Sequence, residues 1–401
     1  MENNDILRHE WPFLFLLYCP KILGLAPTCD TISRADQLGF SLTRCGLTEM
    51  KGKPSPPRKE NHVTLKAVAK HLGLTPGTVS AVLNNSAASR SIPERTRSRI
   101  VEAARKLNYR PNFMARSLRV QRTYTIGVIL EEIGDAYGAS IMSGIEELLR
   151  NRSFFFFTVA HRHDAKLLQT YGHMLMARGV EGFITVDTSI PEKPPLPTVA
   201  VAGHRTVEDV TNITLDHHKA ARLALKHLKE LGHEKMAFLR GQPESSDSED
   251  RWAAICEVAQ ELDIHIRPDL VVQMHGRDST PDLGYTFGKQ LLSHRIAFTA
   301  LFAFNDISAI GAMEAFQEAG LRVPEDVSIV GFDDIAIASF SKPALTTVKQ
   351  PLKRMGEIAA STLLDWIEGR EDYRPEILIE PELVVRKSTA RVPAEIKVAA
   401  K

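Results

Sequence analysis

Two short helices joined by a tight turn, predicted over residues 64–83, leave this segment of the chain few alternative folds. The Thr64 hydroxyl can cap the first helix, and Gly73 can end it, because glycine adopts a left-handed backbone without strain. Thr75 and Pro76 then open the second helix as cap and first-turn proline. A helix pair this short, with glycine in its turn, is typical of a helix-turn-helix, whose second helix enters the major groove of DNA.

Apolar residues at helical spacing give each of these helices one face that can pack against the other. They are Val68, Ala69 and Leu72 in the first helix and Val79, Val82 and Leu83 in the second. The opposite face of the second helix would meet DNA, and the residues expected at or near the base edges are Pro76, Gly77, Thr78, Ser80 and Ala81. The other residues of this segment that we assign to the DNA interface are Thr64, Thr75, Asn84 and Tyr109.

The charge of the chain is distributed very unevenly. Residues 50–123 contain 16 Lys or Arg against 3 Glu, a net charge of +13, whereas the whole chain carries only +1. The remainder therefore carries −12, so a basic segment precedes an acidic body. A run of positive charge can simply be a solvated surface, but here it coincides with the helix-turn-helix pattern and favours contact with the phosphates of double-stranded DNA.

Three motifs in the first half of the chain resemble those of a known family. They read A-V-A-K-H-L-G-L-T-x-x-T-V-S-x-V-L-N over residues 67–84, Y-R-P-N-x-x-A-R-S-L-R over residues 109–119 and T-I-G-V-I over residues 125–129. Together they are similar to the lac repressor (LacI/GalR) family of bacterial transcription regulators. The resemblance extends from about Val63 to about Val392.

This resemblance implies a role for the short amphipathic helix predicted over residues 113–119. In the family such a helix orders on DNA and pushes a leucine into the minor groove, and the matching residue here is Leu118. An apolar wedge of this kind unstacks a base step and kinks the duplex. The residues that would lie beside it are Asn112, Ala115 and Arg116. An ordinary linker helix, with Leu118 in a hydrophobic core, is the alternative interpretation.

The second helix of the pair departs from the family pattern. Many relatives carry larger polar residues where this chain has Pro76, Gly77 and Ala81. These three side chains have little hydrogen-bonding reach, so we expect poor direct readout of base edges from them. Either methyl contacts, DNA shape and the Leu118 step carry the recognition, or the specificity is modest.

From Thr125 onward, apolar strand-like runs alternate with helical stretches. The predicted strands cover residues 125–130, 154–160, 182–186, 198–202, 235–239, 300–304 and 327–332, and the predicted helices include residues 140–150, 219–231, 309–319 and 352–366. Such alternation predicts parallel sheets with helices on both faces, and about 270 residues are more than one core fills. The resemblance implies an all-α helix-turn-helix DNA-binding head followed by an α/β, periplasmic-binding-protein-like core of two doubly wound subdomains.

These arguments divide the chain into five parts. They are an N-terminal extension (1–61), a helix-turn-helix domain (62–108), a hinge helix and linker (109–123), a two-lobed effector-binding and dimerisation core (124–393) and a tail (394–401). Within the core the expected N-lobe takes about 124–215 and 352–380, and the expected C-lobe about 216–350 and 381–393. A ligand would lie in the cleft between the lobes, at the carboxyl ends of the strands.

Polar residues that follow the predicted strands are the candidates for the effector pocket. Asn305 and Asp333 come just after strands, and their amide and carboxylate, with the donor fork of Arg251, suit a hydroxyl-bearing ligand. The resemblance implies that these three residues contact the effector, which in the family is usually a sugar or a nucleobase-like metabolite. Tyr137 and His204, in the loops after the first and fourth strands, are further candidates.

The predicted cleft lacks features of a typical hexose site. The loop after the first strand reads EEIGDAYG, where only Tyr137 can stack on a ring, and the run HGRDSTPD around Ser279 contains no aromatic platform. Asp306 and Asp334 are expected to cap a helix or a loop. We therefore expect the cleft to bind an unusual sugar or acid, or to bind its ligand weakly.

The first 49 residues differ from the rest of the chain. They contain three of the four cysteines, and the remainder only Cys256, which suits a reducing cytoplasm. The apolar run over residues 11–18 is too short to span a bilayer, although it could belong to a secretory signal or to a lipid anchor at Cys19. We favour Met50 as the natural start, which makes residues 51–61 a flexible basic tail and gives the chain no membrane partner.

Common enzyme motifs are absent: the sequence has no G-x-x-x-x-G-K-[ST], G-x-S-x-G, C-x-x-C or H-E-x-x-H. We interpret residues 161–164 and His217-His218 as loop and helix-start residues, so no catalytic residue, metal or cofactor is expected. The leading prediction is a cytoplasmic homodimer that represses transcription from a palindromic DNA operator, under the control of a small-molecule effector, expected to be a sugar or a related metabolite. A solute-binding receptor with a vestigial DNA head, and an enzyme acting on the cleft ligand, are the alternatives.

Overall fold

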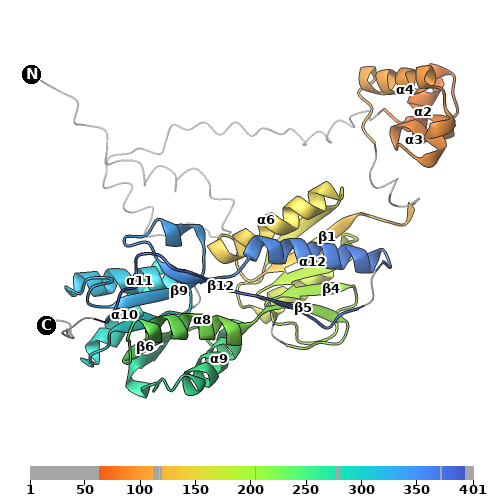
Figure 1. Cartoon of the computed structure of the whole chain (residues 1–401). Coiled ribbons are helices and arrows are strands. Elements are labelled where there is room, and N and C mark those ends of the chain that lie inside the picture. The colour runs from red at the N-terminus through yellow and green to blue at the C-terminus, as the bar shows by residue number, and fades with distance from the viewer. Residues whose placement is uncertain are drawn as a thin grey trace, which may run out of the picture. The chain divides into compact units, whose positions relative to one another are not determined.

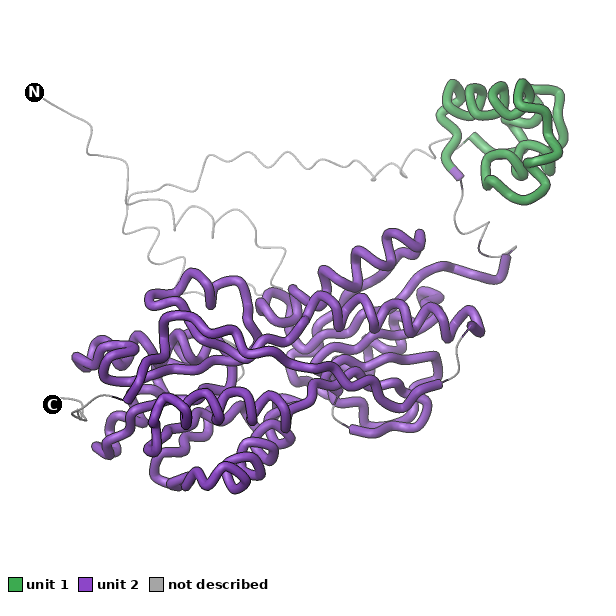
Figure 2. The backbone as a smooth tube through the Cα atoms, in the orientation of Figure 1, with its two compact units in different colours: residues 1–110 green, residues 111–401 purple. Residues whose placement is uncertain are grey.

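The structure, a computed structural model, describes residues 63–111, 117, 120–203, 205–276, 280–370 and 373–392. These residues belong to two compact units, which we describe separately: one ends at Arg110 and the other begins at Pro111 (Figure 2). The described part of the first unit is helical, whereas the second unit combines strands and helices (Figure 1).

The described part of the first unit is a small helical domain. Its elements are α2 (Leu65–Leu72), α3 (Pro76–Leu83), the 3-10 turn η2 (Ala87–Ser91) and α4 (Glu94–Lys106). Thr64 Oγ1 accepts the N–H of Ala67 at 3.2 Å, and Thr75 Oγ1 accepts the N–H of Thr78 at 3.2 Å. Gly73 ends α2 with a φ of 66°. The predicted caps and turn of the helix-turn-helix are therefore confirmed.

Apolar side chains from all three α-helices form the core of this domain. Val68 of α2, Val79 of α3 and Ile100 of α4 are completely buried. Leu72, Val82 and Leu83 pack against them. The third helix thus closes the core that the first two helices leave open, and the outer face of α3 stays free to meet DNA.

The second unit contains two six-stranded sheets. The first sheet has the order β11-β5-β4-β3-β1-β2, with all of its strands parallel. Its strands are β1 (Thr125–Leu130), β2 (Phe155–Ala160), β3 (Phe183–Val186), β4 (Thr198–Val201), β5 (Val210–Leu215) and β11 (Glu376–Ile379). We call the part of the unit around this sheet the N-lobe.

The second sheet has the order β12-β10-β9-β8-β6-β7, in which only β12 is antiparallel to its neighbour. Its strands are β6 (Met236–Arg240), β7 (Val271–Gln273), β8 (Ala300–Phe302), β9 (Ser328–Asp333), β10 (Thr346–Lys349) and β12 (Glu382–Val384). We call the part around it the C-lobe. Along the described chain the strands change sheet after β5, after β10 and after β11, so the chain crosses between the lobes three times.

Helices cover both faces of each sheet (Figure 1). In the N-lobe α6 (Ala136–Asn151) and α12 (Leu352–Ile367) pack on one face, and α7 (Ala165–Ala177) packs on the other. In the C-lobe α8 (His217–Glu230) and α9 (Ser248–Glu261) pack on one face, and α10 (Pro281–Ser293) and α11 (Asp306–Glu318) on the other. Two short turns, η3 (Pro268–Leu270) and η4 (Ala336–Ser339), complete the C-lobe. The predicted fold class of a helical head and a two-part α/β core is confirmed.

Glycines allow the closest helix contact of the N-lobe. Helices α6 and α12 run side by side, and a Cβ at Gly144 of α6 would overlap the carbonyl oxygen of Lys353. A Cβ at Gly356 of α12 would likewise overlap the carbonyl oxygen of Ile141. The two backbones therefore touch directly, and they fix how α12 sits against the lobe.

Candidate ligand cleft and nucleic-acid interface

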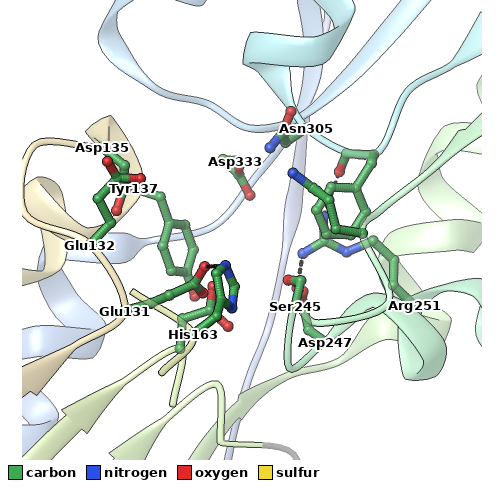
Figure 3. Close-up of a pocket in the computed structure, with 13 residues that line it drawn as sticks. Glu131, Glu132, Asp135, Tyr137, His163, Ser245, Asp247, Arg251, Asn305 and Asp333 are labelled. Atoms are coloured by element: carbon green, nitrogen blue, oxygen red, sulfur yellow. Dashed lines mark hydrogen bonds and ion pairs between the residues drawn. The ribbon is translucent and has the colours of Figure 1, made fainter. Parts of the chain in front are cut away.

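A cavity opens between the N-lobe and the C-lobe, lined by residues that follow the carboxyl ends of parallel strands (Figure 3). The N-lobe contributes Glu131, Glu132, Asp135 and Tyr137 after β1, His163 after β2 and Asp187 after β3. The C-lobe contributes Gln242, Ser245, Asp247 and Arg251 after β6, Phe304 and Asn305 after β8, and Asp333 at the end of β9. In the N-lobe sheet β1 lies between β2 and β3, and in the C-lobe sheet β6 lies between β7 and β8. The chain thus extends each sheet first on one side of its first strand and then on the other, and open α/β sheets bind ligands at this switch in strand order.

Arg251 is the most tightly held cation of the cavity. The side chain is 4% exposed, and its guanidinium lies 3.7 Å from the ring centre of Phe332 and 4.4 Å from that of Phe304. Nη1 donates to the carbonyl oxygen of Phe304 at 2.5 Å, and Nη2 forms an ion pair with Asp247. A guanidinium stacked and bonded in this way keeps one orientation, so its position is set before any ligand arrives.

Asn305 and Asp333 enter the cavity from neighbouring strands of the C-lobe. Asn305 Oδ1 accepts the N–H of Ser308 at 2.9 Å and so caps α11, while its amide group still lines the cavity. Asp333 Oδ1 accepts Nε2 of Gln350 at 2.7 Å. Burial raises the pKa of Asp333 well above its usual range, although the positive charge of Arg251 acts in the opposite direction.

Four of the five predicted effector residues come together at this cavity. Tyr137, Arg251, Asn305 and Asp333 all line it, whereas His204 lies outside the described residues. Tyr137 is half-buried, and burial raises the pKa of its hydroxyl well above the usual value. Position after a strand indicated Tyr137, Asn305 and Asp333, whereas the family resemblance indicated Arg251.

The acidic side of the cavity was not predicted. Asp187 follows β3 and accepts hydrogen bonds from Ser246, from Oγ at 2.5 Å and from the backbone N–H at 3.3 Å. Burial first, and the nearby carboxylates of Glu131 and Asp247 second, raise the pKa of Asp187 well above its usual range. Burial also raises the pKa of Asp135, whose Oδ1 accepts the N–H of Gly138 at 2.6 Å. The available signal was that these residues, too, stand just past strand ends.

His163 also proves to be a cavity residue. We interpreted residues 161–164 as an ordinary loop, and His163 does lie in the loop after β2, but its Nε2 pairs with Glu131 inside the cavity. The hydrogen bond to Glu131 raises the pKa of His163, with burial opposing it. Among the residues described, no group of three or more His, Cys, Asp or Glu is arranged to hold a metal ion.

Ser246 joins the two lobes at the edge of the cavity. It lies between β6 and α9 in the C-lobe, yet its hydroxyl is bonded both to Asp187 and to the carbonyl oxygen of Ala202, which belong to the N-lobe. Movement of one lobe against the other must therefore change these contacts.

Two aspartates near the cavity differ in what they do. Asp306 accepts the backbone N–H of Ile335 at 2.9 Å and the hydroxyl of Thr347 at 2.5 Å, so it caps a loop as expected. Asp334 instead forms an ion pair with Arg386 at 2.6 Å, which corrects our expectation of a capping role.

The exposed face of α3 is small and nearly apolar, as the sequence indicated. Thr75, Pro76 and Gly77 are exposed, and Thr78 and Ala81 are half-buried. Ser80 is only 6% exposed, and its Oγ accepts Nδ2 of Asn84, so its place at the base edges stays a prediction.

Other predicted DNA contacts have structural partners or lie outside the description. Asn84 Nδ2 donates to the carbonyl oxygen and to Oγ of Ser80, at 2.8 and 3.1 Å. Tyr109 packs against the core of the helical domain. The hinge residues that lie outside the described residues are Asn112, Ala115, Arg116 and Leu118.

Comparisons with known proteins agree with this architecture. Residues 64–112 match the family described as bacterial regulatory proteins, lacI family, and residues 225–389 match a periplasmic binding protein-like domain. The HTH-type transcriptional repressor PurR of Haemophilus influenzae is 33% identical over 340 residues, which cover 82% of this chain and 99% of that protein. The PurR repressor of Yersinia pestis is 31% identical over 339 residues, covering 82% and 98%.

Solved structures are similar to this chain over most of its length. The lac repressor dimer bound to operator and the anti-inducer ONPF has a TM-score of 0.73 and 28% identity, covering 82% of this chain and 99% of that chain. A complex of the transcriptional regulator CelR with cellobiose has a TM-score of 0.60 and 26% identity, covering 81% and 99%. Within the described residues, we find no helix with the length and apolar character needed to cross a membrane. The chain therefore belongs to the lacI family of bacterial regulatory proteins, and it is a DNA-binding transcription regulator with a core built to bind a small molecule.

Proposed function

We propose that this protein is a cytoplasmic repressor, which binds a palindromic operator as a homodimer and responds to a small molecule in the cleft. The observation that carries the proposal is the combination of two domains in one chain. One is a helix-turn-helix whose two helices are capped by Thr64 and Thr75, and the other is a two-lobed core in which Arg251 is held in place at the cleft. The relatives support it, since the two PurR proteins are repressors and the lac repressor structure is a dimer on its operator. Two heads related by a two-fold axis would read a palindrome.

On the DNA side, we propose that α3 enters the major groove and presents few hydrogen-bonding groups. Pro76, Gly77, Thr78 and Ala81 would meet the base edges mainly through methyl and backbone contacts. Thr64, Thr75 and Tyr109 would approach the phosphates, and Asn84 would hold the end of α3 through its bonds to Ser80. Leu118, with the hinge residues Asn112, Ala115 and Arg116, supplies the minor-groove wedge in this proposal.

On the ligand side, we propose that Tyr137, Arg251, Asn305 and Asp333 contact the effector, with His204 as a further contact. The CelR structure holds cellobiose, which supports a carbohydrate or a related metabolite as the class of ligand. A ligand that touches both lobes can favour one closure of the cleft over another, and it shifts operator affinity by no more than its differential affinity for the two closures. Hinge segments 109–123 would transmit that closure to the head domain at 62–108.

The experiment that tests this function is selection of bound sequences from a random duplex pool by the full-length protein, at low and at physiological salt. We expect a palindrome that remains enriched at the higher salt, because base contacts and DNA deformation lose less affinity with salt than phosphate contacts do. Recovery of only salt-sensitive DNA without a common sequence would contradict the proposal and favour a solute-binding receptor with a vestigial head.

A further inference from the structure

The cleft contains more carboxyl groups than cations that pair with them. The carboxylates that line it are Glu131, Glu132, Asp135, Asp187, Asp247 and Asp333. Arg251 pairs with Asp247, and His163 pairs with Glu131. Among the described residues, no ion pair reaches the remaining four carboxylates, at Glu132, Asp135, Asp187 and Asp333. They come from both lobes, so carboxyl groups without an ion pair face the cavity from two sides.

Asp333 shows most clearly that the cavity is built for a partner. It is 6% exposed, and Figure 3 shows its carboxylate directed into the cavity between Tyr137 and Asn305. One carboxylate oxygen accepts from Gln350 at 2.7 Å, and the other receives no hydrogen bond from any residue that the structure describes. The hydroxyl of Tyr137 also has no hydrogen-bond partner within the described part of the chain. This oxygen belongs to a side chain that lines the cavity, so a donor group of a ligand in the cavity can reach it.

The carboxyl groups of the cavity favour a positively charged ligand as this donor. Buried carboxylates close to one another disfavour the ionised state, and the raised pKa values of Asp187 and Asp333 reflect this burial and crowding. An anionic ligand, such as a phosphate ester or a carboxylic acid, would add a further negative charge to this cavity. A cation would satisfy the free oxygen of Asp333 and relieve the repulsion between the lobes.

We infer that the effector is a compact molecule with a protonated amino group, held between Asp333 of the C-lobe and Asp135 and Asp187 of the N-lobe. The cavity has a volume of about 60 Å³ at this closure of the lobes, so only a compact molecule or group fits between them. Arg251 and Asn305 remain as donors for hydroxyl or carbonyl oxygens of the same ligand. This inference rests on the proposed role of the cleft. It excludes an acid, which was one of the ligand classes expected from the sequence.

The test is thermal unfolding of the full-length protein, without DNA, in the presence of ligands matched in shape but not in charge. Glucosamine is compared with glucose and with glucose 6-phosphate, and putrescine with 1,4-butanediol. We expect at least one amine to raise Tm by a few degrees while its neutral and anionic counterparts do not, since only the amine binds the folded state. If neither amine raises Tm, or if the neutral counterparts raise it equally, the inference is wrong.

Isosteric variants locate the effect in the cleft. Asp333→Asn and Asp187→Asn should each weaken binding of the stabilising amine at least tenfold in calorimetric titration, because each removes one charge from the site. Glu325→Gln, at an exposed surface position of the C-lobe, is the matched control and should bind as the parent does. Thermal unfolding of the variants without ligand shows whether they are folded. If both Asp variants bind the amine as tightly as the parent does, the assignment is wrong.

The outcome also separates this inference from the proposed function. Selection of operator DNA uses no ligand, whereas the unfolding test uses no DNA. If the DNA selection yields a palindrome but no amine raises Tm, the inferred positive charge of the effector is wrong and the repressor proposal still holds. Amine binding without a palindrome supports the ligand class and contradicts the repressor.

Discussion

At the scale of single residues, buried ionisable groups divide into those that face the cleft and those that serve the fold. Arg251 belongs to the first kind, because its stacked guanidinium lines the cavity. Asp306 belongs to the second: it is fully buried, binds Ile335 and Thr347, and does not line the cavity. The two kinds predict different consequences of mutation.

Asp306 should make the stability of the core depend on pH. Burial raises its pKa from 3.8 to about 7, so the folded state binds a proton more tightly than the unfolded state does. The contribution of this group to stability is therefore fully present below about pH 4 and is lost as the pH rises toward 7. Asp306→Asn should flatten this part of the profile and stabilise the protein at pH 8, by at most ~4 kcal/mol.

Chemical denaturation between pH 4 and pH 8 measures the effect of Asp306→Asn. Glu314→Gln, an exposed position on the same helix, is the control and should leave the profile unchanged. A variant at Asp306 whose stability still falls across this range as steeply as that of the parent would show that another group carries the dependence.

Arg251 should matter for the ligand and not for DNA. Arg251→Lys keeps the positive charge beside Asp247 but removes the planar fork, so effector affinity should fall roughly 10- to 100-fold. Operator affinity without effector should be unchanged, because the helical head is intact. Calorimetric titration of the ligand and a fluorescence assay of operator binding check the two halves, and an undiminished effector response would remove Arg251 from the site.

At the scale of elements, the N-lobe depends on how closely α6 and α12 approach. The backbone of each helix lies against a glycine of the other, at Gly144 and Gly356, so neither position has room for a methyl group. The contact matters beyond packing, because α12 follows the crossing from β10 and α6 begins beside the cleft.

Gly144→Ala should therefore destabilise the protein, by about 1–3 kcal/mol, because its Cβ meets the carbonyl oxygen of Lys353. Gly172→Ala in α7 is the matched control, since a Cβ there meets nothing within 4 Å. That control should be stabilising by roughly 0.5–1 kcal/mol, as alanine favours helix. Thermal or urea unfolding compares the two, and equal stability of both variants would disprove the close contact.

The strands that the sequence predicted have mainly apolar runs, and the strands that it did not predict are β5, β7, β10, β11 and β12. Residues 125–130 match β1 in full, and the other predicted strands differ from the observed ones by one or two residues at their ends. β5 was missed because its run, VTNITL, includes Asn212, which reads as a loop residue. In the structure Asn212 is buried, and its Oδ1 accepts the N–H of Gly203 at 3.1 Å. A polar residue with a backbone partner is thus invisible to hydrophobic patterning.

The candidate site divides in a similar way. Asn305 and Asp333 could be predicted, because an amide or carboxylate directly after a strong strand is conspicuous. Asp187 and His163 could not, since their importance depends on the partners Ser246 and Glu131, which other strands bring to the cavity. Local sequence locates the edge of the sheet, whereas only packing of the lobes shows which charges meet there.

At the scale of the whole molecule, the chain combines a domain that reads DNA with one that senses a ligand. The core divides its residues between two lobes, so a ligand held by both lobes can bias their closure. In the proposed function this closure alters the hinge that the sequence predicts over residues 109–123. The hinge is therefore where binding of DNA and binding of ligand must meet.

Leu118→Ala tests the hinge from the DNA side. If Leu118 is the wedge that the family resemblance implies, the variant keeps weak, salt-sensitive DNA binding but loses most of its preference for the operator. Competition of operator against random duplex at two salt concentrations measures this preference. Val101→Ala, at an exposed position of the head, serves as the control. If Leu118→Ala prefers the operator over random duplex as strongly as the parent does, the wedge hypothesis is wrong.

The hydroxyl of Ser246 has a single proton and two acceptors, Asp187 and the carbonyl oxygen of Ala202. When Asp187 is ionised, the hydroxyl can serve only one of them at a time. When Asp187 is protonated, the carboxyl donates to Ser246 and Ser246 donates to Ala202, so both ties between the lobes hold at once. A cationic ligand favours the ionised form of Asp187, which lacks that proton. Binding of such a ligand therefore costs one of the two hydrogen bonds by which Ser246 joins the lobes.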